Sequence, residues 1–291
     1  MGSINRKRVS MDNNNLAFRK VLVTGANGML GKDLCPILED SGYEVIETDI
    51  DNLDITNELE VQKAFKDIKP DYVIHCAAYT NVDKAEEELE IAKKINALGA
   101  ENIAKACKKF DACMVYVSTD YVFDGTKQTQ YEANDETNPL NNYGLTKLLG
   151  EKAVQENCEK YYITRTSWLY GHHGKNFVET MISLADKDEL KVVDDQIGCP
   201  TWTVDLSNAI ISIIEEEMPY GIYHTCGAGE TSWYGFAKEI FEKESLNVNL
   251  KPCKTEEFPR PAKRPAHSTM NNNKLLRDWK LALSEYLALR V

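Results

Sequence analysis

Residues 20–31, Lys-Val-Leu-Val-Thr-Gly-Ala-Asn-Gly-Met-Leu-Gly, decide how this chain begins to fold. A short apolar run that ends at glycines is typical of a buried parallel strand. Gly25, Gly28 and Gly31 permit a tight turn and a close approach of the backbone to a pyrophosphate. Residues 29–41 follow with the spacing of a helix, whose first N–H groups are free to bind phosphate. The run therefore predicts a strand, a dinucleotide-binding turn and a helix.

The rest of the chain repeats this alternation of short apolar strands and helices. We expect strands at 44–48, 71–76, 113–118 and 161–166, and helices at 57–67, 84–109 and 143–157. Such alternation predicts an α/β fold, a doubly wound (Rossmann) parallel sheet with helices on both faces.

After about residue 170 the pattern is less regular, and a Pro-rich stretch at 258–265 cannot be the interior of a helix. We expect a disordered N-terminal tail at 1–18, a dinucleotide-binding Rossmann core at 19–170, and a small C-terminal substrate-binding lobe at 171–291 whose chain returns to the core. Ligands bind outside the carboxyl ends of the strands in such sheets, so the lobe is expected to lie over that edge.

Composition excludes several classes of protein. Of the 291 residues 43% are hydrophobic, and no apolar run approaches the roughly 18–20 residues that span a bilayer. The formal net charge of −12 argues against a nucleic-acid partner, because phosphates repel such a surface. The eight cysteines form no Cys-x-x-Cys pair and read as reduced thiols. No secretory signal is evident, so we expect a cytoplasmic protein with no membrane partner. We also expect a monomer or a homodimer.

Tyr143 and Lys147 lie four residues apart in an expected helix and therefore share one face. The ordinary pKa of tyrosine, about 10, is too high for easy proton exchange at neutral pH. We expect the Lys147 ammonium and the positive charge of an oxidised nicotinamide to lower the pKa of Tyr143. The same ammonium can reach the nicotinamide ribose, and Thr119 can hydrogen-bond a substrate carbonyl. Tyr143, Lys147 and Thr119 thus predict a nicotinamide-dependent carbonyl reductase.

The ends of the second and third strands supply further cofactor candidates. Asp49 ends the second strand, where a carboxylate accepts hydrogen bonds from the adenosine ribose and repels a 2′-phosphate. No Arg stands beside it, which favours NADH, with NADPH possible. The other candidates are Asp54 and Ile55 beside the adenine and, at the tip of the third strand, Ala77, Ala78 and Tyr79.

Several longer runs carry a more specific resemblance. They begin at Val23 (Val-Thr-Gly-Ala-Asn-Gly-Met-Leu-Gly), Cys76 (Cys-Ala-Ala-Tyr-Thr-Asn-Val-Asp-Lys-Ala-Glu), Ser118 (Ser-Thr-Asp-Tyr-Val-Phe-Asp-Gly), Tyr143 (Tyr-Gly-Leu-Thr-Lys), Arg165 (Arg-Thr-Ser-Trp-Leu-Tyr-Gly), Asn176 (Asn-Phe), Asp195 (Asp-Gln-Ile-Gly-Cys-Pro-Thr) and Arg264 (Arg-Pro). Over about residues 20–270 the chain resembles an extended short-chain dehydrogenase/reductase and, more narrowly, the dTDP-4-dehydrorhamnose reductase family. The resemblance implies NAD(P)H-dependent reduction of the C4 ketone of dTDP-4-dehydro-6-deoxy-L-mannose to dTDP-L-rhamnose, the last step of dTDP-rhamnose synthesis for cell-surface polysaccharide.

The resemblance also implies roles for individual residues. Tyr143 would donate a proton to O4 of the hexulose, Thr119 and Asp120 would contact the sugar, and Trp168 would pack on it. The substrate-binding set is completed by Asn176, Gln196 and Arg264, and the cofactor-binding set, besides the residues above, by Asn27, Met29, Leu30 and Val117.

Two features bear on how far the resemblance extends. The segment from Arg264 to the final helix is shorter than is usual in the family, which leaves the C-terminal packing open. Some relatives hold magnesium at a dimer interface through glutamates, and Asp33 stands where one of them is expected, so Mg²⁺ stays open and no metal ligand is assigned. His172 and His173 are expected to face solvent rather than a metal.

Proteins with other functions have sequences that share many of these motifs. A sugar 4,6-dehydratase needs an acid after Thr119-Asp120, where this chain has Tyr121, and a 4-epimerase differs in the runs around Trp168 and Gln196. A non-catalytic dinucleotide-binding regulatory subunit, resembling the β subunit of methionine adenosyltransferase, has this fold and a similar Tyr-Val-Phe-Asp-Gly run. A reductase of another nucleotide-linked 4-keto deoxysugar is a further alternative.

Overall fold

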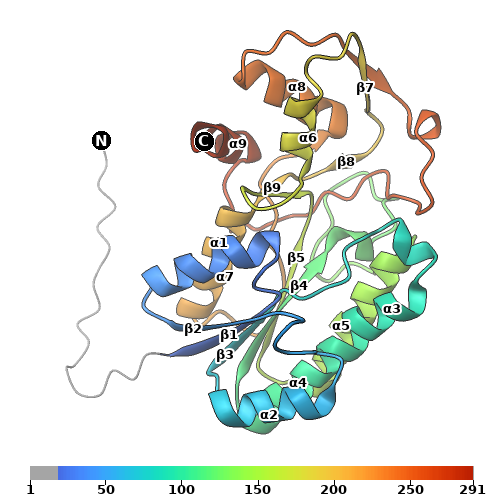
Figure 1. The fold of residues 1–291 in the computed structure, drawn as a ribbon. Coiled ribbons are helices and arrows are strands. Elements are labelled where there is room, and N and C mark those ends of the chain that lie inside the picture. Colours follow the sequence, from blue (N-terminus) through green and yellow to red (C-terminus); the bar gives the residue numbers. More distant parts are fainter. Residues whose placement is uncertain (1–18, 291) are drawn as a thin grey trace.

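A six-stranded sheet forms the centre of the computed structural model, which describes residues 19–290. Its strands are β1 (Lys20–Thr24), β2 (Glu44–Thr48), β3 (Tyr72–His75), β4 (Cys113–Thr119), β5 (Tyr161–Thr166) and β10 (Gly221–His224). They are all parallel, in the order β10-β5-β4-β3-β1-β2. The predicted doubly wound sheet is thereby confirmed, and its strand order reverses between β1 and β3 (Figure 1). The prediction for residues 1–18 lies outside the described residues.

Helices cover both faces of the sheet, and a separate apolar core fills each side. On one face α1 (Met29–Asp40) packs beside α7 (Thr203–Glu215). On the other face lie α2 (Glu58–Ile68), α4 (Ala100–Phe110) and α5 (Asn142–Asn157). Because both faces are buried, the central strands are apolar along their whole length, as Val21, Leu22 and Val23 illustrate with no exposed surface.

The single helix expected at 84–109 is wrong in detail. The structure has a 3₁₀ turn at Lys84–Glu86, a short α3 (Leu89–Lys93), a π-helical stretch at Lys94–Gly99, and only then α4. In the π-helical stretch the Asn96 amide exchanges hydrogen bonds with the backbone of Tyr79 and donates to Thr146. At its end, a Cβ on Gly99 would lie 2.6 Å from Ile55. These tertiary contacts break the regular helix, as π-bulges often do near functional sites.

A second lobe lies beyond one end of the strands of the central sheet (Figure 1). It contains α6 (Phe177–Ser183), α8 (Trp233–Lys243), α9 (Trp279–Ala288), the pairs β7 (Leu190–Val193) with β12 (Leu250–Cys253), β8 (Ile197–Gly198) with β11 (Thr231–Ser232), and β6 (Leu169–Tyr170) with β9 (Thr201–Trp202), and a 3₁₀ turn at Thr255–Glu257. Its own core gathers large aromatic side chains, including Tyr170, Phe236 and Tyr286. Between visits to the lobe the chain returns to the sheet through α7 and β10.

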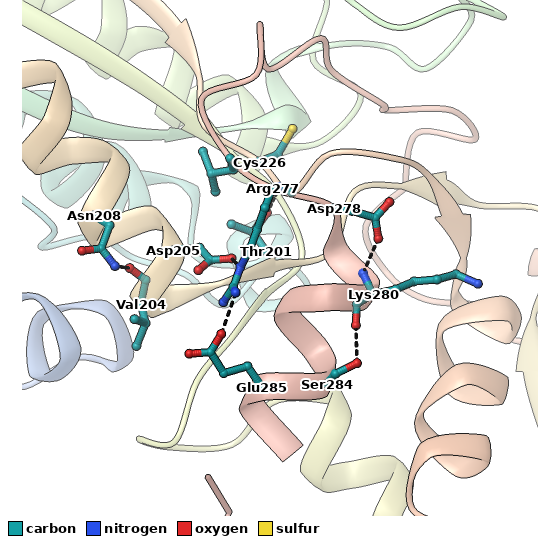
Figure 2. A network of polar contacts seen from close by, with 12 residues as sticks. Thr201, Val204, Asp205, Asn208, Cys226, Arg277, Asp278, Lys280, Ser284 and Glu285 are labelled. Atoms are coloured by element: carbon teal, nitrogen blue, oxygen red, sulfur yellow. Dashed lines mark hydrogen bonds and ion pairs between the residues drawn. The ribbon is translucent and has the colours of Figure 1, made fainter. Parts of the chain in front are cut away.

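The final helix is anchored to the rest of the fold despite the short segment before it. Arg277 donates to Asp205 of α7 at 2.9 Å and to Glu285 of α9 at 2.6 Å (Figure 2). Asp278 caps the first turn of α9 by accepting from the Lys280 N–H. Upstream, the Asn272 amide bonds the carbonyl of Cys226. Polar contacts therefore hold the C-terminal segment against the rest of the protein. No helix within residues 19–290 is long and apolar enough to cross a membrane.

Candidate active site

A cavity of about 850 Å³ opens at the carboxyl ends of the strands, where the strand order reverses. Its wall comes from the ends of β1 to β5, from α5 and, on the lobe side, from Trp233 of α8. The predicted residues that line it are Gly25, Asn27, Gly28, Met29, Leu30, Asp49, Asp54, Ile55, Ala77, Ala78, Val117, Thr119, Asp120, Tyr143, Lys147 and Trp168. The fold thus brings most of the sequence candidates to one place.

The glycine turn has the geometry that a dinucleotide requires. Gly25 has a φ of +71°, and a Cβ there would lie 2.6 Å from the Ala77 nitrogen. A Cβ on Gly31 would lie 2.6 Å from Ala26, so this glycine lets α1 approach the turn. Gly28, the N-cap of α1, provides no capping side chain, which leaves the first N–H groups of the helix available to an anion. These residues therefore fit the pyrophosphate of a dinucleotide cofactor.

Asp49, which follows β2, contacts this glycine turn. Its carboxylate accepts from the Asn27 N–H at 3.0 Å and from its neighbour's N–H, that of Ile50, at 2.8 Å. Asp54 accepts from both the N–H and the hydroxyl of Thr56, and these bonds lower the pKa of that carboxyl. Both acids stay at the cavity wall, where they can meet the adenosine half of a cofactor.

Tyr143 and Thr119 face one another in the cavity, but the pKa of the tyrosine moves against our expectation. Burial raises the pKa of Tyr143 to about 12, and the hydrogen bond with Thr119 only partly opposes this. The Lys147 ammonium donates to the Val117 carbonyl at 2.7 Å and lies 4.1 Å from the centre of the Tyr116 ring. The expectation that the ammonium lowers this pKa is therefore wrong for the protein alone, because desolvation dominates. Burial also lowers the pKa of Lys147, to about 7.

A buried ion pair lies behind these residues. Arg165 of β5 donates to both oxygens of Glu151 of α5, at 2.9 and 2.7 Å, and Ser118 of β4 donates to the same carboxylate. The two charged side chains are 3% and 1% exposed. Through Glu151, these bonds connect α5, the helix that carries Tyr143 and Lys147, to β4 and β5. They therefore fix the position of both side chains relative to the sheet.

Asp120 is an acid held in a dry environment beside the catalytic candidates. Its carboxyl accepts from Ser268 at 2.6 Å and from Thr119 at 3.0 Å, and the residue is 2% exposed. Burial raises the pKa of Asp120 to about 6, although these hydrogen bonds act in the opposite direction.

This shift predicts a pH dependence of stability. The folded pKa lies above the unfolded value of about 3.9, so the folded state binds the proton more tightly between about pH 4 and pH 6. We expect the free energy of unfolding of the wild type to fall across this window, by about 2–3 kcal/mol relative to Asp120→Asn, and then to level off. Urea unfolding of both proteins from pH 4 to pH 7 measures this; parallel curves would contradict it.

Four predicted residues do not line the cavity. The Tyr79 hydroxyl donates to Glu88, away from it. Asn176 caps α6 and donates to the Gly171 carbonyl. Gln196 accepts from Trp233, and Arg264 pairs with Asp83 at 2.5 Å beside Tyr121. Gln196 and Arg264 therefore contact residues that line the cavity, Trp233 and Tyr121, without lining it themselves. Asn176 instead contacts residues of the second lobe.

Trp233 is the main site residue that the sequence analysis missed. It stacks on Trp168, with ring centres 3.5 Å apart and planes at 5°. It lies far along the chain, at the start of a helix in the irregular second half, and no motif marks it. Only the aromatic character of the position could have drawn attention to it.

Neither histidine of the His172-His173 pair reaches the cavity. Both are exposed; His172 stacks on Tyr286 and His173 lies 3.5 Å from Asp33, which also accepts from Thr203. Within residues 19–290 no group of three or more His, Cys, Asp or Glu side chains is arranged to hold a metal ion. These residues do not test the open assignment of Mg²⁺, for which the sequence analysis named no ligand.

The fold and the site together define a nicotinamide-dependent oxidoreductase of the extended short-chain dehydrogenase/reductase class. The family described as the RmlD substrate binding domain matches residues 19–289. The chain belongs to this family, that of the dTDP-4-dehydrorhamnose reductases.

Individual relatives agree over nearly the whole chain. The crystal structure of a dTDP-4-dehydrorhamnose reductase from Clostridium acetobutylicum is 50% identical, with a TM-score of 0.90, and the match covers 93% of this chain and 99% of that one. The enzyme of the same name from Bacillus anthracis, solved in complex with NADP, is 43% identical with a TM-score of 0.91, over 94% and 100%. The spore coat polysaccharide biosynthesis protein SpsK of Bacillus subtilis is 42% identical, over 92% and 96%.

Proposed function

We propose that this protein reduces the C4 ketone of dTDP-4-dehydrorhamnose to give dTDP-L-rhamnose, the last step of dTDP-rhamnose synthesis for cell-surface polysaccharide. The observation that carries the proposal is the convergence of Tyr143, Thr119 and Lys147 on one wall of a cavity that begins at the glycine turn. Relatives called dTDP-4-dehydrorhamnose reductase, similar over nearly the full chain, supply the choice of substrate.

The cavity residues account for the steps around the carbonyl. Gly25, Gly28 and the N-terminus of α1 would hold the cofactor pyrophosphate, and the bound nicotinamide supplies the hydride for the ketone carbon. Thr119, whose hydroxyl donates to Asp120 in the free protein, would turn that proton to the ketone oxygen and orient it. Tyr143 gives its proton to that oxygen as negative charge develops on it, which completes the alcohol.

Lys147 has two tasks in this scheme. Its ammonium contacts the Val117 carbonyl and the Tyr116 ring, and the residue lines the cavity. From there it can bond the ribose hydroxyls and stabilise the tyrosinate left after proton transfer. With a pKa of about 7 it can also release a proton and so help to restore the phenol.

We propose NADH as the preferred cofactor, with NADPH as the alternative. The wall that would meet the adenosine ribose carries the carboxylate of Asp49, and within the described residues the only Lys or Arg that lines the cavity is Lys147. A 2′-phosphate would meet a negative charge there without a cation to pair with. The Bacillus anthracis relative was solved with NADP, so the preference needs a direct test.

Replacing Asp49 by Ala is expected to lower the ratio of kcat/KM for NADH to that for NADPH. The substitution removes two acceptor oxygens for the ribose hydroxyls and the charge that repels the phosphate. Steady-state kinetics with each cofactor measure the ratio. Asp51→Ala, which removes an exposed acid two residues away, is the matched control. A wild-type preference for NADPH, or a ratio that Asp49→Ala leaves unchanged, would contradict the assignment.

Turnover of the purified protein tests the function itself. Oxidation of NADH that depends on dTDP-4-dehydrorhamnose, with dTDP-L-rhamnose as product, is the expected result. Activity only with another nucleotide-linked 4-keto deoxysugar would change the substrate and keep the reaction. Binding of the dinucleotide without turnover of any such sugar would instead favour the regulatory subunit. In the proposal the chain works as a monomer or a homodimer.

A further inference from the structure

Trp168 has a backbone conformation that a bulky residue rarely adopts. Its φ is +47°, in the left-handed region, where non-glycine side chains crowd the backbone. It lies two residues after the end of β5 and lines the cavity, so this conformation sets the direction of the ring. A residue kept in a sparsely populated conformation needs surroundings that hold it there, and such positions gather at ligand sites.

Two groups of the lobe hold the indole. Trp233 covers it face to face, at 3.5 Å between ring centres. Gly198 of β8 lies against it as well: a Cβ at this position would come within 2.4 to 2.7 Å of three indole atoms. A side chain at position 198 would therefore displace the ring. Face-to-face stacking is not the arrangement that aromatic pairs prefer, so the pair's geometry reflects the clamp rather than an intrinsic optimum.

Trp233 is in turn fixed by its own neighbours. Its indole N–H donates to the Gln196 side-chain oxygen at 3.2 Å, and the Gln196 amide donates to Thr255 at 3.0 Å. Phe177 of α6 packs on the Trp233 ring at 4.6 Å. The indole that lines the cavity is thus connected, through Trp233, to three separate segments of the lobe.

We propose that Trp233 is a positioning residue for the sugar nucleotide, acting through Trp168. This rests on the proposed function. Trp233 and Gly198 hold the Trp168 indole in its strained conformation before the substrate arrives, so that a flat apolar face is ready for the C–H groups and methyl of the deoxysugar. Gln196 contributes by holding Trp233. Without this clamp Trp168 relaxes, and binding of the sugar must order it again, which weakens affinity.

The experiment compares two ligands in three variants. The Kd of dTDP-L-rhamnose and that of dTDP, which lacks the sugar, are measured by calorimetry for wild type, Trp233→Leu and Trp233→Phe. Ordering one side chain on binding corresponds to roughly a 2- to 10-fold loss of affinity. We expect Trp233→Leu to weaken dTDP-L-rhamnose by this factor and leave dTDP and NADH unchanged, and Trp233→Phe, which can still stack, to retain near-normal affinity. The exciton signal of the stacked indoles in circular dichroism should disappear in both variants.

A double-mutant cycle shows whether Trp233 acts through Trp168. In a Trp168→Leu background, Trp233→Leu should cause no further loss of affinity for dTDP-L-rhamnose. Additive losses, an equal loss for dTDP, or unchanged affinity in a folded Trp233→Leu protein would each overturn the proposal. If Trp233→Leu does not fold, Gln196→Ala takes its place with the same expected pattern. A wild type that binds neither ligand and turns over no dTDP-sugar would refute the proposed function instead.

Discussion

Tyr143→Phe is expected to lower kcat for ketone reduction by roughly 10²- to 10⁴-fold, the usual contribution of a positioned proton donor. Burial raises the pKa of the Tyr143 phenol to about 12, so it keeps its proton at neutral pH until a stronger base, the developing alkoxide, forms beside it. Phenylalanine keeps the ring and removes only the hydroxyl group that carries the proton. The Kd of NADH should therefore remain close to that of the wild type.

Single-turnover kinetics with saturating NADH measure this effect on the chemical step. Tyr223→Phe is the matched control, because its hydroxyl donates to the Pro219 carbonyl and does not line the cavity. That variant should retain wild-type turnover. A Tyr143→Phe enzyme that keeps more than about a tenth of wild-type kcat would remove Tyr143 from the role of proton donor.

Glu151→Gln is expected to destabilise the folded protein by about 3–5 kcal/mol, because it leaves the Arg165 guanidinium buried without a counter-charge. The side chains of this pair are 3% and 1% exposed, and the carboxylate accepts from Arg165 and Ser118 together. Replacing both partners, as Glu151→Leu with Arg165→Met, should recover most of the loss, since no isolated charge then remains.

Denaturant unfolding of these variants gives the free energies. The matched control is Glu159→Gln, which breaks the pair with Lys108 at side chains 58% and 83% exposed, where a change within about 0.5 kcal/mol is expected. If Glu151→Gln proved as stable as Glu159→Gln, the buried pair would not be what holds α5 to the sheet. The same result would weaken the argument that it sets the position of Tyr143 and Lys147.

The cofactor side of the site was the more predictable part. Gly25 and Asp49 occupy local positions, a strand end and the turn beyond it, that parallel sheets bring to one edge whatever else the chain does. The sugar side was harder, because its residues come from segments whose arrangement depends on packing. Gln196 and Arg264 were chosen from family runs, and they support the wall rather than form it.

The sequence by itself determined the α/β class, the glycine turn, and the placing of Tyr143 and Lys147 on one helix face. Each depends on local periodicity or on the backbone freedom of glycine, which are written into neighbouring residues. Only the tertiary structure decided that π-helical backbone interrupts the helix before α4, that Lys147 turns to Val117 and Tyr116, and that Trp233 joins the site. It also decided that the pKa of Tyr143 rises, because desolvation depends on every group that surrounds a side chain, and these come from distant parts of the chain.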